Sequence, residues 1–397
     1  MTASDLPVDI AIIGGGIAGL WTLNQLRNAG YSAVLFECED LGGYQTISSQ
    51  GMIHGGIKYA LGGALSGGSE AISTMPAIWR DCLKGEGKVD LRDSKVLSED
   101  FFLWSSANLQ SRLTSFFASK MLRGRVNKLR ASEYPPAFQD PAFSGTVYRL
   151  VDLVMNMPSL IKCLADQHRD AIFKIDWQSS HLQVEQGVAS IATPAATVRP
   201  NRLILSAGVG NESLLAQLGS DTPVMQRRPL QQVLMKHEYR ESLYAHCMGG
   251  NPSPRLTISS HRTLADEPVW YLGGDLATEG TDDPPEVLID KARREVGALF
   301  PWINFGKTEW RTIKLDRAEP RQSSLLRPDQ SYVGKTKTLS NVLTAWPTKL
   351  TLSPHLGNEI EATLLGDGIS PRVQANLAQL APLGTPAVAA TCWDTLF

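Results

Sequence analysis

A glycine-rich turn near the start of the chain, placed between a buried strand and an amphipathic helix, restricts the fold more than any other feature. Residues Val8 to Ile13 are mostly apolar and branched, as in a buried parallel strand. Gly14 to Gly19 reads GGGIAG and matches GxGxxG, and a helix is predicted from about Ile17 to Asn28. A second buried strand from Ser32 to Phe36 completes a βαβ unit, which predicts an α/β fold with a Rossmann-like domain.

Each glycine of this turn has a distinct physical role in binding a dinucleotide. Gly14 permits the tight turn, Gly16 lets the backbone approach a pyrophosphate, and Gly19 allows close packing of helix on strand. The helix N-terminus, at Ile17 and Ala18, supplies N–H groups and partial positive charge for the phosphates. Alternatively, the glycines form only a tight turn and bind no dinucleotide.

An acidic residue follows at the end of the second predicted strand. Glu37 lies 18 residues after Gly19, where a carboxylate accepts hydrogen bonds from the adenosine ribose hydroxyls. The same charge repels a 2′-phosphate and therefore disfavours NADP. The fingerprint by itself does not separate FAD from NAD.

Charge and cysteine content exclude several other classes of protein. The net charge of −2 gives no electrostatic argument for nucleic acid, so we expect no nucleic-acid partner. The five cysteines are scattered without a CxxC pair, which indicates neither a metal site nor a redox dithiol.

The sequence also bears on the location of the protein. The segment Met1 to Asp5 has no basic region like that of a signal peptide, and no apolar run reaches the roughly 18–20 residues of a membrane span. We expect a cytoplasmic protein without a transmembrane segment.

The chain reads as helical to about Leu129 and carries a basic run there. Such a run is usually a solvated helix face, and peripheral contact with a membrane surface or an acidic partner is the alternative. Its members are Lys120, Arg123, Arg125, Lys128 and Arg130.

The stretch Thr46 to Tyr59, TISSQGMIHGGIKY, resembles the D-amino-acid oxidase/glycine oxidase superfamily of FAD-dependent oxidoreductases. Its Ser-Ser…Ile-His-Gly-Gly…Tyr pattern is especially similar to the glycerol-3-phosphate dehydrogenase and L-2-hydroxyglutarate oxidase branches. The resemblance implies that this loop crosses the flavin and that glycines let its backbone lie against the ring. It also implies that serines contact FAD ribityl or phosphate oxygens and that a histidine lies near the isoalloxazine. The residues concerned are Ser48, Ser49, Gly51, His54, Gly55 and Gly56.

Two later segments resemble the same family. Leu203 to Gly208 is similar to its second FAD strand, which would bring Ala207 and Gly208 to the cofactor. Ser324 to Leu364 is similar to the C-terminal FAD segment, with Leu350 and Thr351 at the cofactor. A helix that begins with Ser353 as N-cap and Pro354 at its first position would point its N-terminus at the flavin N1–C2 edge and stabilise negative charge there.

One departure from the family pattern lies just before that helix. Pro347 and Lys349 occupy positions where the family usually has glycines close to the flavin. Lys349 either supplies positive charge beside flavin N1 and O2 or is an ordinary solvated lysine. We expect the FAD to be non-covalent because no cysteine lies in the flavin loops, although His54 leaves a covalent link open.

The spacing of these segments predicts a discontinuous FAD-binding domain of residues 1–80, 151–223 and 316–397. An inserted α+β substrate domain built on an antiparallel sheet would then comprise residues 81–150 and 224–315.

The chemistry expected of such a protein is hydride transfer from a small substrate to flavin N5. By resemblance, Arg317 anchors an anionic group of the substrate, and an ion pair with Asp316 or Glu319 is the alternative. His54 either takes a hydroxyl proton as a general base or packs the flavin loop.

The favoured hypothesis is oxidation of an amine or amino acid. The alternatives are oxidation of a 2-hydroxy acid or phosphorylated polyol with transfer to a quinone, and an FAD-containing subunit without turnover. Oxygen or a quinone would be the electron acceptor.

Overall fold

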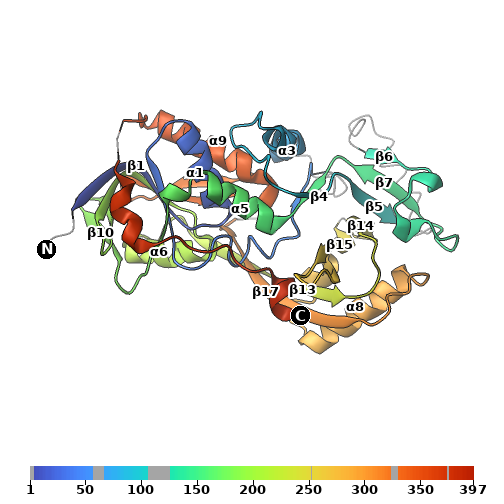
Figure 1. Cartoon of the computed structure of the whole chain (residues 1–397). Helices are drawn as coiled ribbons and strands as arrows, with labels where there is room; N and C mark the ends of the chain where they lie inside the picture. The colour runs from blue at the N-terminus through green and yellow to red at the C-terminus, as the bar shows by residue number, and fades with distance from the viewer. Residues whose placement is uncertain (1–3, 57–66, 106–125, 252, 323–329, 373–374) are drawn as a thin grey trace.

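The computed structural model of the 397-residue chain describes residues 4–56, 67–105, 126–251, 253–322, 330–372 and 375–397. Tyr59 and three members of the predicted basic run, Lys120, Arg123 and Arg125, therefore lie outside the described residues. Figure 1 shows two parts side by side. One contains β1, β10, α1 and α9, and the other contains β13, β15, β17 and α8.

The first part is built on a largely parallel sheet, called here the first sheet. Its strands β12, β1, β2 and β9 are parallel neighbours in that order, and β19 runs parallel to β12. Strands β10, β11 and β18 add antiparallel edges. The strands are β1 (Asp5–Ile13), β2 (Ala33–Glu37), β9 (Ile172–Lys174), β10 (His181–Glu185), β11 (Val188–Ala192), β12 (Thr197–Leu205), β18 (Tyr332–Lys335) and β19 (Val342–Trp346).

Helices cover one face of the first sheet because alternate strand residues there are apolar. Ile10, Ile12 and Leu35 pack with apolar side chains of four helices in one buried cluster. Figure 1 shows these helices on the same side of β1. They are α1 (Ile17–Asn28), α3 (Gly67–Lys84), α5 (Met157–Gln167) and α9 (Ser353–Gly366). The opposite face packs against α6 (Asn211–Gln217) and the 3₁₀ helix Leu377–Leu383.

The second part is built on a largely antiparallel sheet, called here the second sheet. Its order is β17-β13-β16-β15-β14-β5-β7-β6, and the β14–β5 pair alone among them is parallel in the described chain. Helix α8 (Pro285–Leu299) packs its apolar stripe on one face of this sheet. The strands are β5 (Phe101–Ser105), β6 (Val126–Lys128), β7 (Thr146–Leu150), β13 (Met225–Lys236), β14 (Ala245–Met248), β15 (Pro254–Arg262), β16 (Pro268–Gly273) and β17 (Glu309–Pro320).

The described chain also contains a small third sheet and several short helices. A three-stranded antiparallel sheet is formed by β3 (Met52–Ile53), β8 (Leu153–Met155) and β4 (Val96–Ser98). The short helices α7 (Asp275–Glu279) and α10 (Cys392–Leu396) lie against the second sheet. The remaining 3₁₀ helices are Ala131–Glu133, Pro136–Phe138, Arg169–Ala171, Gly208–Gly210 and Leu350–Leu352.

The expected α/β class, with a parallel Rossmann-like sheet and a largely antiparallel second sheet, is confirmed. The proposed domain boundaries stay a prediction. The helical interpretation to Leu129 is wrong, because α3 ends at Lys84 and strands β4, β5 and β6 follow. Pairing with distant strands decides the conformation of such short segments. The prediction that Ser353 caps the last long helix is also wrong by one residue. A 3₁₀ turn leads directly into α9, so Leu352 is the N-cap and Ser353 is the first helical residue.

Candidate functional site

A cavity of about 500 Å³ opens at the carboxyl edge of the first sheet. In open α/β sheets this edge is where ligands bind, because the loops that leave parallel strands converge there. Segments that follow β1, β2, β9, β12 and β19 supply most of its wall. Predicted residues that line the cavity are Gly14, Gly16, Ile17, Ala18, Glu37, Ser49, Ala207, Gly208, Lys349 and Leu350.

The turn after β1 is shaped to bring backbone N–H groups to the cavity. Gly14 has a φ of 110°, and a Cβ added there would lie 2.7 Å from the backbone of Ala207. Gly16 borders the cavity, where an added Cβ would meet Thr46 Oγ1 at 3.1 Å. Gly19 faces inward, and an added Cβ would lie 1.9 Å from Gly14 O, which fits its expected packing function. Because the first N–H groups of a helix have no intrahelical partner, this end of α1 can receive an anion.

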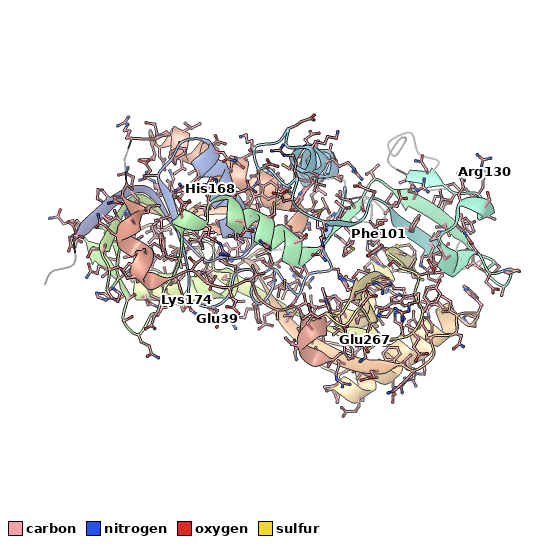
Figure 2. All side chains as sticks on the ribbon, in the orientation of Figure 1. Glu39, Phe101, Arg130, His168, Lys174 and Glu267 are labelled. Carbon is pink, nitrogen blue, oxygen red and sulfur yellow. The ribbon has the colours of Figure 1, made fainter. Side chains whose placement is uncertain are left out.

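The carboxylate of Glu37 is held at the next strand end. Its Oε2 accepts a hydrogen bond from the Gly15 N–H at 2.6 Å, and its Oε1 accepts one from the Glu39 N–H at 2.9 Å. Trp177 borders this end of the cavity from the segment after β9. Figure 2 labels Glu39 and Lys174 in the half of the molecule that holds the first sheet, whereas Phe101 and Glu267 lie in the other half.

The segment between β19 and α9 forms another part of the wall. Thr348 takes a φ of 61°, a left-handed conformation that favours glycine, and its Oγ1 donates to Gln330 O at 2.9 Å. Lys349 lines the cavity with only 6% of its surface exposed, so it is not an ordinary solvated lysine. A 3₁₀ turn, Leu350–Leu352, then leads directly into α9. A positive φ at Thr348 explains how this chain makes the turn without the family's glycines.

The other predicted residues, all within the described part of the chain, are not among those that line the cavity. Several of them contact other buried segments of the chain. Thr351 Oγ1 donates to His54 O at 3.1 Å, and the Gly55 N–H donates to Asp152 Oδ1 at 2.8 Å. An added Cβ on Gly51 would lie 2.2 Å from Met155 O. The complete set is Gly19, Ser48, Gly51, His54, Gly55, Gly56, Arg317 and Thr351.

Arg317 lies on β17, next to the cavity-lining Ala318. Its Nε donates to the backbone oxygen of Arg228 at 3.3 Å across the β13–β17 ladder. The two carboxylates expected as alternative partners bind other arginines. Glu319 pairs with Arg228 at 2.7 Å, and Asp316 lies 3.8 Å from a guanidinium nitrogen of Arg227.

Several wall residues were missed by the sequence interpretation. They carry no motif, but nearly all follow a strand of the first sheet or lie in the loops beside it, and that position is the signal that would have found them. They are Cys38, Glu39, Tyr44, Gln45, Trp177, Val209, Gly210, Ser213, Leu214, Gln217, Ala318, Trp346 and Thr348.

These residues fit a bound dinucleotide. A glycine turn without side chains, a helix N-terminus and a fixed carboxylate all border this one cavity. Within the described ranges, no group of three or more His, Cys, Asp or Glu residues is placed to hold a metal ion. Within the same ranges, no helix is both long enough and apolar enough to cross a membrane.

Comparison with known proteins identifies the dinucleotide. A model of the DAO family, described as FAD dependent oxidoreductase, matches residues 9–343. The chain belongs to the DAO family of FAD-dependent oxidoreductases. Its cofactor is therefore FAD.

Among DAO-family relatives, the FAD-dependent oxidoreductase PA4991 of Pseudomonas aeruginosa is 46% identical over 395 residues, which cover 99% of each chain. Its crystal structure superposes with a TM-score of 0.86 and 40% identity and covers 100% of both chains. Glycine oxidase from Geobacillus kaustophilus superposes with a TM-score of 0.65 and 14% identity, covering 97% of this chain and 100% of that one. L-alpha-glycerophosphate oxidase from Mycoplasma pneumoniae gives 0.62 and 14%, covering 94% and 98%. These last two similarities show the shared fold.

Proposed function

We propose that this DAO-family enzyme oxidises a small anionic amine or amino acid by hydride transfer to flavin N5. The observation that carries this proposal is the chemistry of the cavity wall near Lys349. Among the described lining residues the cation is Lys349, and the same described set contains no histidine. A neutral amine loses hydride without a base, whereas an alcohol needs one to take its hydroxyl proton. When bound, FAD accepts that hydride with its two electrons and passes them to oxygen or a quinone.

Structural neighbours support the amine reading. By name they include glycine oxidase, iminodiacetate oxidase, L-amino acid deaminase and L-proline dehydrogenase, whose substrates all carry nitrogen at the reacting carbon. L-alpha-glycerophosphate oxidase is the neighbour that favours the alternative, a phosphorylated polyol or 2-hydroxy acid.

The chain's own residues would hold FAD in a defined direction along the cavity. The N–H groups at Gly16 and Ala18 would bind the pyrophosphate, beside the Ile17 N–H, which donates to Thr46 Oγ1 at 3.1 Å, and the Glu37 carboxylate would bind the adenosine ribose. Leu350 and the buried ammonium of Lys349 would lie at the flavin, with α9 adding the positive end of its dipole. The 3₁₀ helix at Gly208 and the loop at Ser49 close the sides.

Non-covalent binding is part of the same proposal. The cysteine that lines the cavity is Cys38, next to Glu37 at the ribose end. Burial and the neighbouring Glu37 charge raise the pKa of the Cys38 thiol to about 11, so it stays protonated and a poor nucleophile. Acid precipitation should leave a colourless pellet and a yellow supernatant, and a yellow pellet would contradict non-covalent binding.

Arg317 would anchor the anionic group of the substrate. A guanidinium is suited to this function because it binds a carboxylate in fork geometry. Its strand joins the cavity wall to the second sheet, since the Asp316 N–H donates to Tyr44 Oη and the Ala318 N–H to Gln45 Oε1, both at 3.2 Å.

Anaerobic titration of the purified yellow protein with a substrate panel tests the reaction class. Amino acids or small amines should bleach the flavin, whereas 2-hydroxy acids and phosphorylated polyols should not. Bleaching by the second group alone would establish the alternative. No bleaching by any member would favour a subunit without turnover.

His54 provides an independent check on the same question. With an amine supplied at high pH, His54→Ala should lower the rate of flavin reduction only mildly. A hydroxy-acid dehydrogenase that used His54 as its base would instead slow by about 10²–10⁴-fold.

A further inference from the structure

The loop that carries Ser49 into the cavity exchanges hydrogen bonds with the second sheet in both directions. Gln50 Nε2 donates to the backbone oxygen of Tyr271 at 2.8 Å and to Ser259 Oγ at 3.2 Å. In return, Tyr271 Oη lies within hydrogen-bond distance of two acceptors, the backbone oxygen of Ser48 at 3.0 Å and Gln232 Oε1 at 2.8 Å, which share its one proton. Ser49 therefore lies between two residues that are both tied to Tyr271.

All of these groups are buried. Tyr271 is 0% exposed, Ser48 is 5% exposed and Gln50 is 9% exposed. A hydrogen bond removed at such a site leaves its partner unsatisfied, which costs more than an exposed bond is worth. Burial raises the pKa of Tyr271 well above its ordinary value, so its hydroxyl remains a donor across the physiological range.

A segment distant in the sequence supports Tyr271 from the other side. Cys392 and Trp393 belong to the same buried cluster as Tyr271, and the centroid of the Trp393 ring lies 6.0 Å from that of Tyr271. Trp393 also stacks on His261 with a centroid distance of 4.0 Å. Cys392 and Trp393 belong to α10, which Figure 1 shows against β13 and β17 at the C-terminal end.

The same segment also contacts the cavity rim. The Leu41 N–H donates to Ala387 O at 2.7 Å, and the Ala389 N–H donates back to Leu41 O at 3.0 Å. Leu41 follows Asp40, which lines the cavity. Residues 387–397 thus run from the rim of the FAD cavity to the sheet that carries Tyr271.

We propose that Tyr271 is a positioning residue that sets the place of Ser49 against the cofactor, and that residues 387–397 hold Tyr271 in register. This proposal rests on the assignment of Ser49 to the FAD site. In this arrangement the second sheet and the flavin loop move as one unit, so the distance between substrate and flavin is fixed by the Gln50–Tyr271 exchange.

Tyr271→Phe tests the proposal because it removes one hydroxyl and keeps the ring. Apoprotein titrated with FAD should show a dissociation constant about tenfold higher than that of the wild type. The visible circular dichroism of the bound flavin should change as well, since the loop beside it relaxes. Tyr244→Phe is the matched control: this buried tyrosine belongs to the cluster around Phe101, and both FAD affinity and the flavin spectrum should stay unchanged.

Unchanged affinity and spectrum in Tyr271→Phe would overturn the proposal, even if the variant lost thermal stability. If Tyr271→Phe does not fold, Trp393→Leu carries the test, because it keeps every group of the Gln50–Tyr271 exchange and removes the ring that holds Tyr271 in register. The flavin spectrum should then change in the same sense, and an unchanged spectrum would contradict the positioning role. Wild-type apoprotein that did not bind FAD would refute the site itself, which is a distinguishable result.

Discussion

The Glu37 carboxylate accepts a 2.6 Å hydrogen bond from the backbone N–H of Gly15. This bond fixes the carboxylate at the turn between β1 and α1, so the strand that carries the acid and the turn that carries the cradle hold each other in place. A preorganised acceptor loses little side-chain entropy when a ribose hydroxyl binds to it. This one hydrogen bond therefore connects the two parts of the dinucleotide fingerprint, the glycine turn and the acid that follows the second strand.

Glu37→Gln should weaken FAD binding, since the amide is neutral and directs an N–H donor or a weaker acceptor at the ribose. Hydrogen bonds to charged groups contribute about 1.5–3 kcal/mol, so the dissociation constant should rise by about one to two powers of ten. Titration of apoprotein with FAD measures it. Glu86→Gln changes an exposed carboxylate that does not line the cavity and should leave the constant nearly unchanged. Equal effects of the two substitutions would contradict a specific function of Glu37.

Arg317→Ala should raise the apparent KM for the true substrate by about one to two powers of ten, while FAD stays bound. The loss of a charge-assisted contact accounts for the effect. Steady-state kinetics and the visible spectrum together provide the measurement. Lys314→Ala removes an exposed cation from the same strand and should not alter KM. An unchanged KM in Arg317→Ala would place the anchor elsewhere.

Lys349→Met should make the midpoint potential of the bound flavin more negative, because the buried ammonium stabilises the negative charge gained on reduction. A loss of about 1.4 kcal/mol corresponds to about 30 mV for a two-electron couple. Spectroelectrochemistry with Lys335→Met as control resolves such a shift, since Lys335 pairs with Asp367 on the surface. A potential that did not move would mean that Lys349 does not act on the flavin.

Stability should fall as the solution becomes acidic, partly because of His237. This side chain is 3% exposed, its ring centroid lies 5.3 Å from that of Trp270, and burial lowers its pKa from 6.5 to about 4. Between these two values the unfolded chain binds the proton and the folded chain does not. The free energy of unfolding is therefore fully retained above pH 6.5 and declines as the pH falls toward 4, by up to about 1.4 kcal/mol per pH unit.

Urea unfolding at several pH values measures this slope. His237→Phe should flatten it, and part should remain because burial also lowers the pKa of His261, to about 3. His181→Phe, at an exposed position, should leave the slope as it is. An unaltered slope in His237→Phe would contradict the prediction.

Local sequence signals predicted the nucleotide-binding elements well, because each is specified by residues next to one another. The predicted helix from Ile17 to Asn28 coincides with α1, and the βαβ unit and the segment at Ala207 meet at one sheet edge. The glycine turn, the acid at Glu37 and the parallel strand pattern all favour the same arrangement, and such agreement between levels makes a prediction reliable.

Features that depend on tertiary contacts could not be read in the same way. The apolar run of β5, Phe101 to Ser105, has no alternation that would distinguish strand from helix, and pairing with β14 and β7 decides its conformation. Trp177 carries no motif and reaches the cavity only through the packing of the loop after β9. Thr348 takes a positive φ, a conformation that no sequence rule would assign to a β-branched residue.

A crystal structure of the FAD-loaded protein tests the central claim most directly, because it reads the direction of the cofactor in the cavity. We expect the pyrophosphate at the N-terminus of α1, the ribose at Glu37 and the N1–C2 edge of the flavin beside Lys349. An isoalloxazine ring at the Trp177 end, or a pyrophosphate away from Gly16, would contradict it.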